Sequence, residues 1–449
     1  MKFSCPAKQL TTALNTVMGA IPTKPNHPIL AHVLLLATPQ TIEVRAFDLS
    51  LGITAQFNAP VEVEGALTLP AKHLLNLIAS LPKDEELSFE AQLNQTEAIL
   101  TSAGKRYTFR GFKASQFPQL PTEFPLTVPA IRLTATVLAR GLKTTLFAAT
   151  IDEMKPVLSG IRLTIEAAQV EFAATNGKVL AIVQDSIPTH ENQQQSDTTK
   201  KHKTKRKSLP SASSPWGITI PKTALKELQK LLGNPTDNLT DSEVLLHFND
   251  SQILFTSATF SLVCRALTGD YPDYTQLLPK QWSHEVTVSS HQLLAAVTRL
   301  ATFDKHKIIR LVLNPTEQVL SLYGQGQDIG SGAESLPALI QGEGLEIGFD
   351  AEVLIPALKA IPTSEVHFLF NEANTPATLN TVANSLGTAT VLVMPVELWS
   401  AELPSLSSTS QALTVSSDEF QSIDTESEEA SEPKIDSEDS QLELATLPM

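Results

Sequence analysis

Cysteine is almost absent from this chain, which contains only Cys5 and Cys264 in 449 residues. Two cysteines cannot build a disulfide framework, and no CxxC pair or Cys/His cluster gives the ligand spacing of a zinc site. No apolar run reaches the roughly 18 residues that a membrane-spanning helix needs. The amino terminus, MKFSCPAKQL, lacks the apolar core of a secretory signal. These absences favour a globular, cytoplasmic protein without a metal site or membrane contact.

Aromatic residues make up 6% of the chain, too few for the base-stacking platforms of single-strand binding proteins. The net charge of −15 is unevenly distributed. Residues 399–449 carry twelve acids and one base, so this Ser-, Glu- and Asp-rich stretch is predicted to be a disordered acidic tail. Residues 189–214 are polar and contain the run KKHKTKRK, which predicts a disordered basic insertion. The acidity of the whole chain therefore says little about its partners.

A short strand that leads into an amphipathic helix occurs three times in the sequence. The three copies read ALTLPAKHLLNLIASL, GITIPKTALKELQKLL and LEIGFDAEVLIPALKAI. Larger units begin at Lys2, Ile131 and Val286, and the second gap equals the first, at 129 residues, once the 26-residue insertion is removed. Such regular spacing predicts three copies of one unit with two helices in each copy.

Six helices are predicted, at residues 6–18, 70–80, 134–147, 221–232, 289–301 and 350–360. Thr134 and Ser289 are candidate N-caps, and Pro356 is expected to kink or shorten the last helix. These segments contain nine bases and three acids, although the chain as a whole is acidic. A basic helical surface is what sequence-independent binding to a nucleic-acid backbone requires. The alternative is that lysine is simply a favourable residue on a solvated helix.

Nine short stretches resemble the bacterial DNA sliding clamp family, the beta subunit of DNA polymerase III. In chain order they are MKFSCPAKQL, HPILAHVLL, FDLSLG, LPAKHLL, FPQLP, AATNGKVLA, YPDYTQLLPK, LEIGF and VLVMPVEL. The resemblance implies an α+β fold of three repeated clamp domains, each with two helices packed on β-sheets. It also implies that the chain is half of a closed ring, with helices inside and sheets outside. The implied domains are 1–128, 129–281 with the insertion 189–214, and 282–398, followed by the tail 399–449.

The resemblance implies a DNA polymerase processivity factor that encircles duplex DNA and tethers replication and repair proteins through a peptide-binding groove. The implied partners are double-stranded DNA without sequence preference, the catalytic subunit of DNA polymerase III, the clamp loader and other clamp-binding proteins. A second copy of the chain, joined head to tail, would complete the ring. This role breaks no bond, so no enzymatic activity and no cofactor is expected.

Two sets of bases are candidates for contact with DNA. The positions that match the family's DNA-contacting residues are Lys24, Lys72, Lys155 and Lys222. The bases of the predicted helices add Arg140, Lys143 and Lys226. For Lys24, the alternative is an ordinary exposed loop lysine between Pro22 and Pro25.

The family's partner groove lies between the second and third repeats and the segment that ends the folded body. By the resemblance it comprises Leu158, Thr175, Gly177, Lys178, Leu180, Pro272, Leu277, Pro376, Leu392, Met394, Pro395 and Val396. Such Leu, Met and Pro side chains suit short peptides with apolar anchors. The alternative is that Asn176-Gly177 is an ordinary hairpin turn and residues 391–398 an ordinary last strand. Val179 and Gln276 stand where relatives often carry arginine, so the preferred peptide is expected to differ.

Ring closure in the family implies that Tyr107 and Phe109 of one chain face Thr302 and Phe303 of its partner. The alternative is that the two aromatic side chains serve the core of their own domain. Two other classes of function fit the sequence less well. A repeat scaffold that binds proteins but not DNA predicts no excess of bases on the helices. An enzyme lacks a site, because GQGQDIGSG has no following helix and TNGK lacks the spacing of a phosphate loop.

Overall fold

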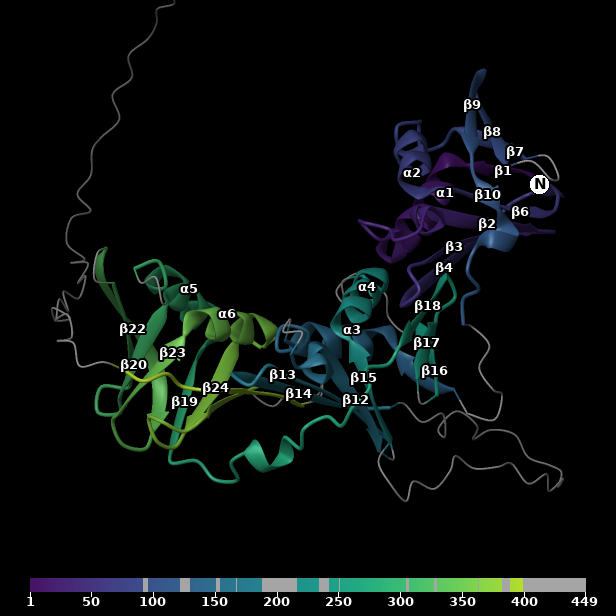
Figure 1. Cartoon of the computed structure of the whole chain (residues 1–449). Helices are drawn as coiled ribbons and strands as arrows, with labels where there is room; N and C mark the ends of the chain where they lie inside the picture. The colour runs from purple at the N-terminus through teal and green to yellow at the C-terminus, as the bar shows by residue number, and fades with distance from the viewer. Residues whose placement is uncertain are drawn as a thin grey trace, which may run out of the picture. The chain divides into compact units, whose positions relative to one another are not determined.

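The computed structural model describes residues 1–91, 96–121, 130–150, 154–166, 168–187, 216–233, 242–249, 251–303, 307–326, 329–361, 363–381 and 388–398 (Figure 1). The predicted basic insertion, residues 189–214, lies outside these residues, and so does the predicted acidic tail, residues 399–449. Among the described residues, no helix is long and apolar enough to cross a membrane.

One unit of secondary structure occurs three times: a strand, a helix, a group of strands, a second helix and three further strands, to which the first repeat adds the short β10. The first repeat contains β1 (Lys2–Pro6), α1 (Ala7–Val17), η1 (Met18–Ala20), η2 (Pro28–Ala31), β2 (His32–Thr38), β3 (Thr41–Phe47), β4 (Leu51–Asn58), β5 (Val61–Val63), β6 (Gly65–Pro70), α2 (Ala71–Ala79), β7 (Glu86–Ala91), β8 (Glu97–Ser102), β9 (Lys105–Arg110), β10 (Phe112–Lys113) and η3 (Ala114–Gln116). The second contains β11 (Ile131–Thr134), α3 (Ala135–Thr145), η4 (Pro156–Ser159), β12 (Gly160–Glu166), β13 (Gln169–Thr175), β14 (Val179–Ser186), β15 (Trp216–Pro221), α4 (Lys222–Leu232), β16 (Glu243–Phe248), β17 (Gln252–Thr256), β18 (Phe260–Arg265) and η5 (Thr275–Leu277). The third contains β19 (His284–Ser289), α5 (Ser290–Leu300), β20 (Ile308–Asn314), β21 (Val319–Gly326), β22 (Gly330–Gln341), β23 (Leu345–Asp350), α6 (Ala351–Ala360), β24 (Glu365–Phe370), β25 (Ala377–Thr381) and β26 (Thr388–Val393). The threefold repetition predicted from the sequence is confirmed.

Burial follows the period of each element. In β2, Val33 and Leu35 are buried while their neighbours in the strand are partly exposed. In α1, Leu10 and Leu14 are four residues apart and are both fully buried. One large core includes buried side chains from all six helices. Each helix therefore packs one apolar side into this core and leaves its polar side to solvent.

The helices begin and end within two residues of the predicted bounds. The two predicted caps are confirmed, because the side chain of Thr134 accepts from the Val137 N–H at 3.2 Å and that of Ser289 from the Gln292 N–H at 3.4 Å.

The predicted effect of Pro356 on helix length is small, because α6 is one residue shorter than α1, α3, α4 and α5, and the predicted kink stays a prediction. Helix α6 runs through Pro356 without a break and is one residue longer than α2. A proline at this position removes one helical N–H donor. Leu354 and Leu358 on either side of it are buried, and this apolar packing stabilises the helix across the missing hydrogen bond.

The described strands form three sheets, of five, nine and twelve strands. The two larger sheets run from one repeat into the next. Strand β4 of the first repeat pairs antiparallel with β18 of the second, and we call this pairing the first joint. Strand β14 of the second repeat pairs antiparallel with β26 of the third, and we call this pairing the second joint. The repeats are therefore joined by backbone ladders.

Equivalent positions in the three repeats follow from the ladder registers. The strands β4, β14 and β22 occupy the same place in the three repeats. Their equivalent residues are those that pair with the matching residue of the preceding strand: Ile53 with Ala46, Ala181 with Ala174, and Gly332 with Gly324. The strands β18, β26 and β9 are also equivalent. When ladder pairs are followed from the strand before the first helix of each repeat, the equivalent residues on these strands are Leu262, Val391 and Tyr107. Leu262 pairs with Ile53 at the first joint, and Val391 pairs with Ala181 at the second.

Strand β9 and the first half of β22 have no such partner among the described strands. Strand β9 is the last strand of its sheet. Strand β22 pairs with β21 over residues 330–337, and with β19 on its other side only over residues 338–341. We call the outer sides of β9 and of residues 330–336 the open edges.

Candidate nucleic-acid and peptide interfaces

The helices are linked from repeat to repeat, as the strands are. Helix α1 packs on α2, α3 on α4, and α5 on α6. At the second joint α3 also contacts α6, where the hydroxyl of Thr144 donates to the carbonyl of Ala360 at 3.2 Å. At the first joint the carboxylate of Glu227, on α4, fills the space that a side chain on Gly19 would occupy.

The six helices carry nine bases and two acids, Glu227 and Glu352. Five of the bases are exposed and form no ion pair with another residue in the described part of the chain: Lys8, Lys72, Lys143, Lys226 and Lys359. Five helices each contribute one of these free lysines. The solvent side of the helices therefore offers positive charges that have no acidic partner among the described residues.

The other four helical bases form hydrogen bonds or ion pairs within the protein. The ammonium of Lys222 donates to the carbonyl of Ala149 at 2.6 Å, and burial, followed by the charge of Lys226, lowers the pKa of Lys222. Lys230 pairs with Glu227 at 2.7 Å.

Arg140 and Lys222 are the two helical bases that are only partly exposed. The guanidinium of Arg140 pairs with the carboxylate of Asp185 on β14, and the two side chains are 17% and 9% exposed. Burial lowers the pKa of Arg140. The DNA contact predicted for Arg140 remains a prediction, and Asp185 competes for the same guanidinium.

Arg299 has a partner but stays at the surface. Its guanidinium forms two hydrogen bonds with Glu334 of β22, at 2.8 and 2.5 Å. The side chain of Arg299 is 60% exposed. The pair connects α5 to one of the open edges.

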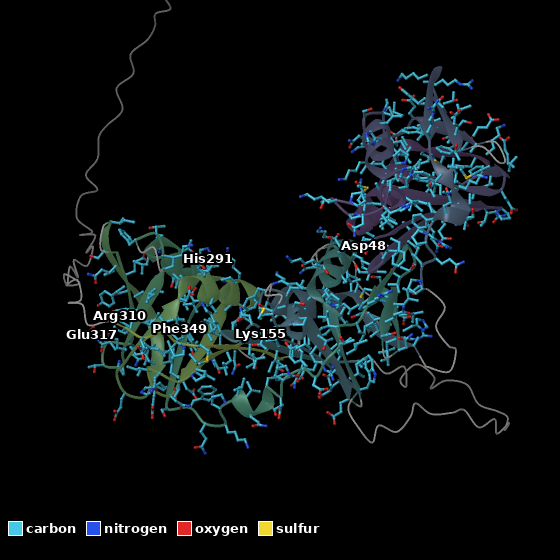
Figure 2. The ribbon with its side chains drawn as sticks, viewed as in Figure 1. Asp48, Lys155, His291, Arg310, Glu317 and Phe349 are labelled. Atoms are coloured by element: carbon cyan, nitrogen blue, oxygen red, sulfur yellow. The ribbon has the colours of Figure 1, made fainter. Side chains whose placement is uncertain are left out.

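Two of the predicted DNA-contacting lysines lie outside the helices. Lys24 is exposed in the loop between η1 and η2. Lys155, labelled in Figure 2, is exposed and directly precedes η4, which carries Leu158. The carbonyl of Lys155 accepts from the N–H of Leu158 at 3.0 Å, so the structure places Lys155 next to a residue of the predicted peptide groove.

A small apolar cluster lies at the second joint, separate from the large core. It contains buried Leu180 and Leu392, from the two strands of the joint, together with Ala173, Ile182 and Tyr274. Tyr271 and Leu278 pack against it. This second-joint cluster brings together parts of three predicted groove segments.

Two large apolar side chains of the predicted groove stay exposed. Leu277 is 55% exposed and Met394 is 41% exposed. Met394 donates its N–H to the carbonyl of Lys178 at 2.9 Å, which fixes it beside the turn between β13 and β14. Exposed apolar side chains beside a buried apolar cluster are typical of a peptide-binding surface.

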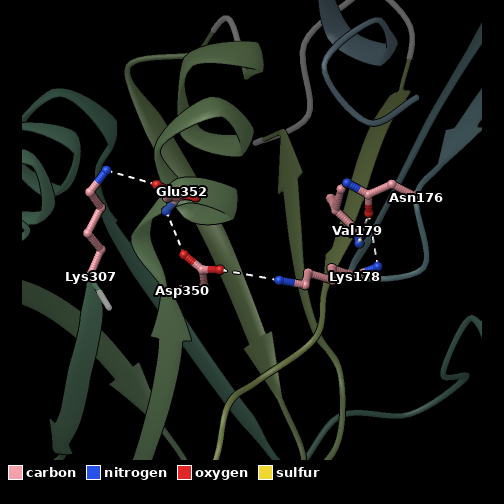
Figure 3. Close-up of polar contacts among 6 residues, drawn as sticks. All are labelled: Asn176, Lys178, Val179, Lys307, Asp350 and Glu352. Carbon is pink, nitrogen blue, oxygen red and sulfur yellow. Dashed lines mark hydrogen bonds and ion pairs between the residues drawn. The ribbon is translucent and has the colours of Figure 1, made fainter. Parts of the chain in front are cut away.

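The turn before β14 is fixed by its own side chain and by the third repeat. The Asn176 carbonyl oxygen accepts from the N–H groups of Lys178 and Val179 at 2.9 and 3.0 Å. Figure 3 shows the Lys178 ammonium reaching Asp350, at 3.6 Å. Asp350 in turn accepts from the N–H of Glu352 at 2.8 Å as the N-cap of α6. The hairpin turn that the sequence analysis gave as an alternative is therefore present, and the contact from Lys178 to Asp350 connects the second repeat to the third.

The remaining groove residues have different degrees of exposure. Gly177 and Pro272 are exposed, Leu158 is buried, and Thr175, Pro376, Pro395 and Val396 are half-buried. The Thr175 N–H donates to the hydroxyl of Tyr271 at 3.0 Å, which ties β13 to the segment that carries Pro272.

Sequence reasoning missed Tyr271, Tyr274 and Ile182 as members of this surface. The sequence could have indicated the two tyrosines, because they stand on either side of Pro272 and Asp273 in the YPDY motif. Burial raises the pKa of Tyr271 to about 12. Burial, followed by a hydrogen bond to Glu171, also raises the pKa of Tyr274.

Solved proteins share this arrangement of repeats. The sliding clamp of Bacillus subtilis matches with a TM-score of 0.78 at 23% identity, over 89% of this chain and 100% of that one. The fold is therefore that of a DNA sliding clamp.

Relatives in sequence give the family. Residues 1–121 match the N-terminal domain of the DNA polymerase III beta subunit, and residues 275–397 match its C-terminal domain. The beta sliding clamp of Synechococcus elongatus is 37% identical over 404 residues, and that of Synechocystis is 34% identical over 409 residues. Both matches cover 89% of this chain and 100% of the relative. The chain belongs to the bacterial beta sliding clamp family and is a DNA polymerase processivity factor, so a protein-only scaffold is not favoured.

Proposed function

We propose that two copies of this chain join head to tail into a ring that encircles duplex DNA. The helices face the DNA, and the second joint binds peptides of the polymerase, the clamp loader and other clamp-binding proteins. The three domains have the predicted bounds 1–128, 129–281 and 282–398. The ring acts in the cytoplasm as a scaffold without catalytic activity.

The open edges carry the proposal of a ring. At both joints within the chain, a strand equivalent to β22 pairs with a strand equivalent to β9. Continuing the repeat places β9 of one copy on β22 of the other, with Tyr107 opposite Gly332 and Phe109 opposite Gly330. An unpaired strand edge exposes backbone donors and acceptors that a second chain can satisfy. Because the contact is heterologous, it closes a ring only if the rotation between the two copies allows it.

Side-chain size supports this register. Tyr107 and Phe109 are half-buried and pack on the large core, as the alternative from the sequence expected, yet both stand on an open edge. Phe303 covers the space above Gly332, where an added side chain would come within 2.8 Å of its ring. Thr302, next to it, is exposed. Gly330 has no atom within 4 Å of an added side chain, so the open edge leaves room there for the ring of Phe109.

The exposed lysines support the contact with DNA. Lys8, Lys72, Lys143, Lys226 and Lys359 have no acidic partner in the described part of the chain, so they can approach phosphates without first breaking an ion pair. We add Lys24 and Lys155, which are exposed outside the helices. Lys222 contributes once its hydrogen bond to Ala149 opens. Contacts of this kind with phosphates are independent of sequence and permit sliding.

The second-joint cluster supports peptide binding. Leu277 and Met394 remain exposed beside buried apolar residues, and Lys178 adds a positive charge. Val179 is buried in the joint and Gln276 donates to Asp273 at 2.8 Å. Neither side chain offers the positive charge of the arginine that relatives often carry there, so we expect the preferred peptide to differ.

Retention on DNA tests the proposed function. The chain is loaded onto nicked circular DNA by a clamp loader, and half of the sample is then linearised. The ring is expected to stay on the circle and to leave the linear molecule by sliding off its ends. Equal retention on both forms contradicts the ring. Assays for nuclease and NTPase activity on the same preparation are expected to read zero.

A further inference from the structure

The first joint repeats the turn geometry of the second. The Asp48 carboxylate, labelled in Figure 2, accepts from the N–H groups of Ser50 and Leu51 at 2.8 and 2.6 Å. Asn176 makes the same two contacts in the turn before β14. The second residue of each turn has a left-handed backbone, with φ of 78° at Leu49 and 90° at Gly177. The two turns are therefore equivalent parts of the repeat.

Leucine is the unexpected residue in this comparison. Glycine adopts a left-handed backbone without steric cost, whereas the Cβ of leucine clashes there and strains the chain. Leu49 is nevertheless present, and its side chain is 50% exposed. A strained backbone that presents an apolar side chain to solvent contributes little to folding. Such strain is typical of functional sites.

A base stands beside this exposed leucine. The Arg265 N–H donates to the carbonyl of Ser50 at 3.3 Å, just as the Met394 N–H donates to the carbonyl of Lys178 at the second joint. Arg265 is exposed and forms no ion pair with another described residue. Each joint therefore displays one large apolar side chain and one base: Leu49 and Arg265 at the first joint, Met394 and Lys178 at the second. Arg265 and Met394 occupy equivalent positions, whereas Leu49 and Lys178 occupy neighbouring positions of the equivalent turns.

A second small apolar cluster also lies in this part of the first repeat. It contains buried Ile29, Leu30, Phe47 and Phe117, and Leu120 packs against it. Leu120 reaches the joint itself, because a side chain added to Gly52 would meet its Cδ2 at 3.0 Å. The second-joint cluster likewise ends on the strands of its joint.

We propose that the first joint is a second peptide-binding site, with Leu49 as the apolar contact and Arg265 as the charged contact. Its occupant is an extended segment of a partner protein that carries an apolar side chain next to a carboxylate. The apolar side chain covers Leu49, and the carboxylate pairs with Arg265. One oxygen of the Asp48 carboxylate, Oδ1, accepts from three donors of its own turn, including the Ser50 hydroxyl. This inference takes the second joint as its template and so rests on the proposed function.

Peptide titration of the full 449-residue chain tests the inference. The chain is labelled at leucine and methionine methyl groups, and the pentapeptide GDLFG is added while the methyl signals of Leu49 and Met394 are recorded by NMR. Both signals are expected to shift, each with its own saturation curve. Leu49→Gly relieves the backbone strain and removes the apolar contact, so it is expected to fold and to abolish saturation at the first joint. Arg265→Glu is expected to weaken that site at least tenfold.

The outcomes separate the two proposals. Shifts at Met394 without shifts at Leu49 overturn the second site and leave the proposed function intact. Shifts at Leu49 alone support the second site and overturn peptide binding at the second joint, and silence at both residues overturns both. Leu339→Asn, which changes another exposed leucine outside both joints, is the matched control and is expected to leave both curves unchanged. If Leu49→Gly instead changes the mass of the assembly in sedimentation, the occupant is a second copy of this chain and the peptide proposal is wrong.

Discussion

The two joints inside the chain differ from the open edges in how side-chain volume is shared. At the two positions equivalent to Tyr107 and Phe109, the joints pair aliphatic residues or a cysteine: Leu262 with Ile53 and Cys264 with Leu51, then Val391 with Ala181 and Val393 with Val179. At the open edges the equivalent residues are two aromatics, Tyr107 and Phe109, and two glycines, Gly332 and Gly330. The inner joints are ladders within one chain, whereas in the proposed ring the edges would meet only when two folded chains associate. Aromatic anchors against glycines suit a contact between preformed surfaces.

The ion pairs of the second joint and of the open edge also differ, in how exposed they are. The joint strand β14 is tied to α3 by the buried pair of Arg140 and Asp185. The edge strand β22 is tied to α5 by the exposed pair of Arg299 and Glu334. A buried pair is costly to break because it leaves an unpaired charge in the interior, whereas an exposed pair exchanges its partner for water. Breaking the ion pair at the joint is therefore expected to cost much more free energy than breaking the pair at the open edge.

The largest effect is expected from Phe109→Asp. The proposed ring has two interfaces, and loss of a buried Phe at each would remove about 3–6 kcal/mol, or a factor of roughly 100 to 20,000 in the dissociation constant. Sedimentation equilibrium is expected to show monomers at concentrations where the unchanged chain is a dimer. Leu339→Asp changes an exposed leucine of β22 as a control, and its mass is expected to stay that of the dimer. A dimeric Phe109→Asp chain that remains fully folded would contradict the proposed edge.

Loss of the buried pair at the joint comes next. Arg140→Ala leaves Asp185 buried without a partner and is expected to lower the free energy of unfolding by about 3–5 kcal/mol. Chemical denaturation measures this change. Removal of both charges by Arg140→Met with Asp185→Leu is expected to restore most of the loss. Arg299→Ala, at the open edge, is expected to leave the midpoint unchanged, and an equal loss there would erase the distinction between joint and edge.

The second-joint cluster is expected to make stability sensitive to alkali. Burial raises the pKa of Tyr271 from 10.0 to about 12. Between pH 10 and 12 the unfolded chain releases this proton while the folded chain keeps it, so the folded state binds more protons and stability falls as pH rises. Tyr271→Phe is expected to flatten this fall, as measured by denaturation at several pH values. Phenolate absorbance of the folded chain that rises fully at about pH 10 would rule out the buried tyrosine.

The smallest effect concerns single lysines. Lys143→Ala is expected to reduce the slope of log affinity for duplex DNA against log salt by about 0.9 for each phosphate that the lysine no longer neutralises. Its effect on the free energy of unfolding is expected to stay within about 0.5 kcal/mol, as is usual for an exposed residue. The double change Arg140→Met with Asp185→Leu, three residues away on the same helix, tests the predicted contact of Arg140 and is expected to change the slope less, because Asp185 already pairs with that guanidinium. A salt slope that changes for Arg140→Met with Asp185→Leu but not for Lys143→Ala would reverse the assignment of the two bases.

Local patterns account for most of what the sequence could predict. Apolar periodicity placed all six helices because each helix packs one face into the core. The caps at Thr134 and Ser289 are also local, since each side chain bonds a backbone N–H three residues away. Pro356 does not end its helix, because buried Leu354 and Leu358 pack on either side of it, and that packing is visible only in the folded chain.

Long-range partners were beyond the sequence. Arg140 and Lys143 look alike in a helix pattern, and only the position of Asp185, 45 residues away, separates them. The left-handed backbone at Leu49 gave no signal, because leucine does not predict that conformation. The joint registers also depend on strands more than 200 residues apart, such as β4 and β18. The resemblance to a family predicted the residues of the groove and the ring interface. It did not predict which of these residues are buried.

Covalent closure of the open edges tests the ring most directly. The register places Thr108 opposite Ser331, and Cα atoms of directly opposite residues lie about 4.5–5.5 Å apart, within reach of a disulfide. The natural cysteines, Cys5 and Cys264, are buried, and burial raises the pKa of each to about 12, so they should not compete.

The chain with Thr108→Cys and Ser331→Cys, loaded on nicked circular DNA and oxidised, is expected to form closed two-chain rings. These rings should survive denaturant on the circle and be released when it is linearised. A control with Thr108→Cys and Ser335→Cys, displaced by about 13 Å along the strand, should not cross-link. Open-ended multimers, or loss of the cross-linked chains from an intact circle, would contradict the account.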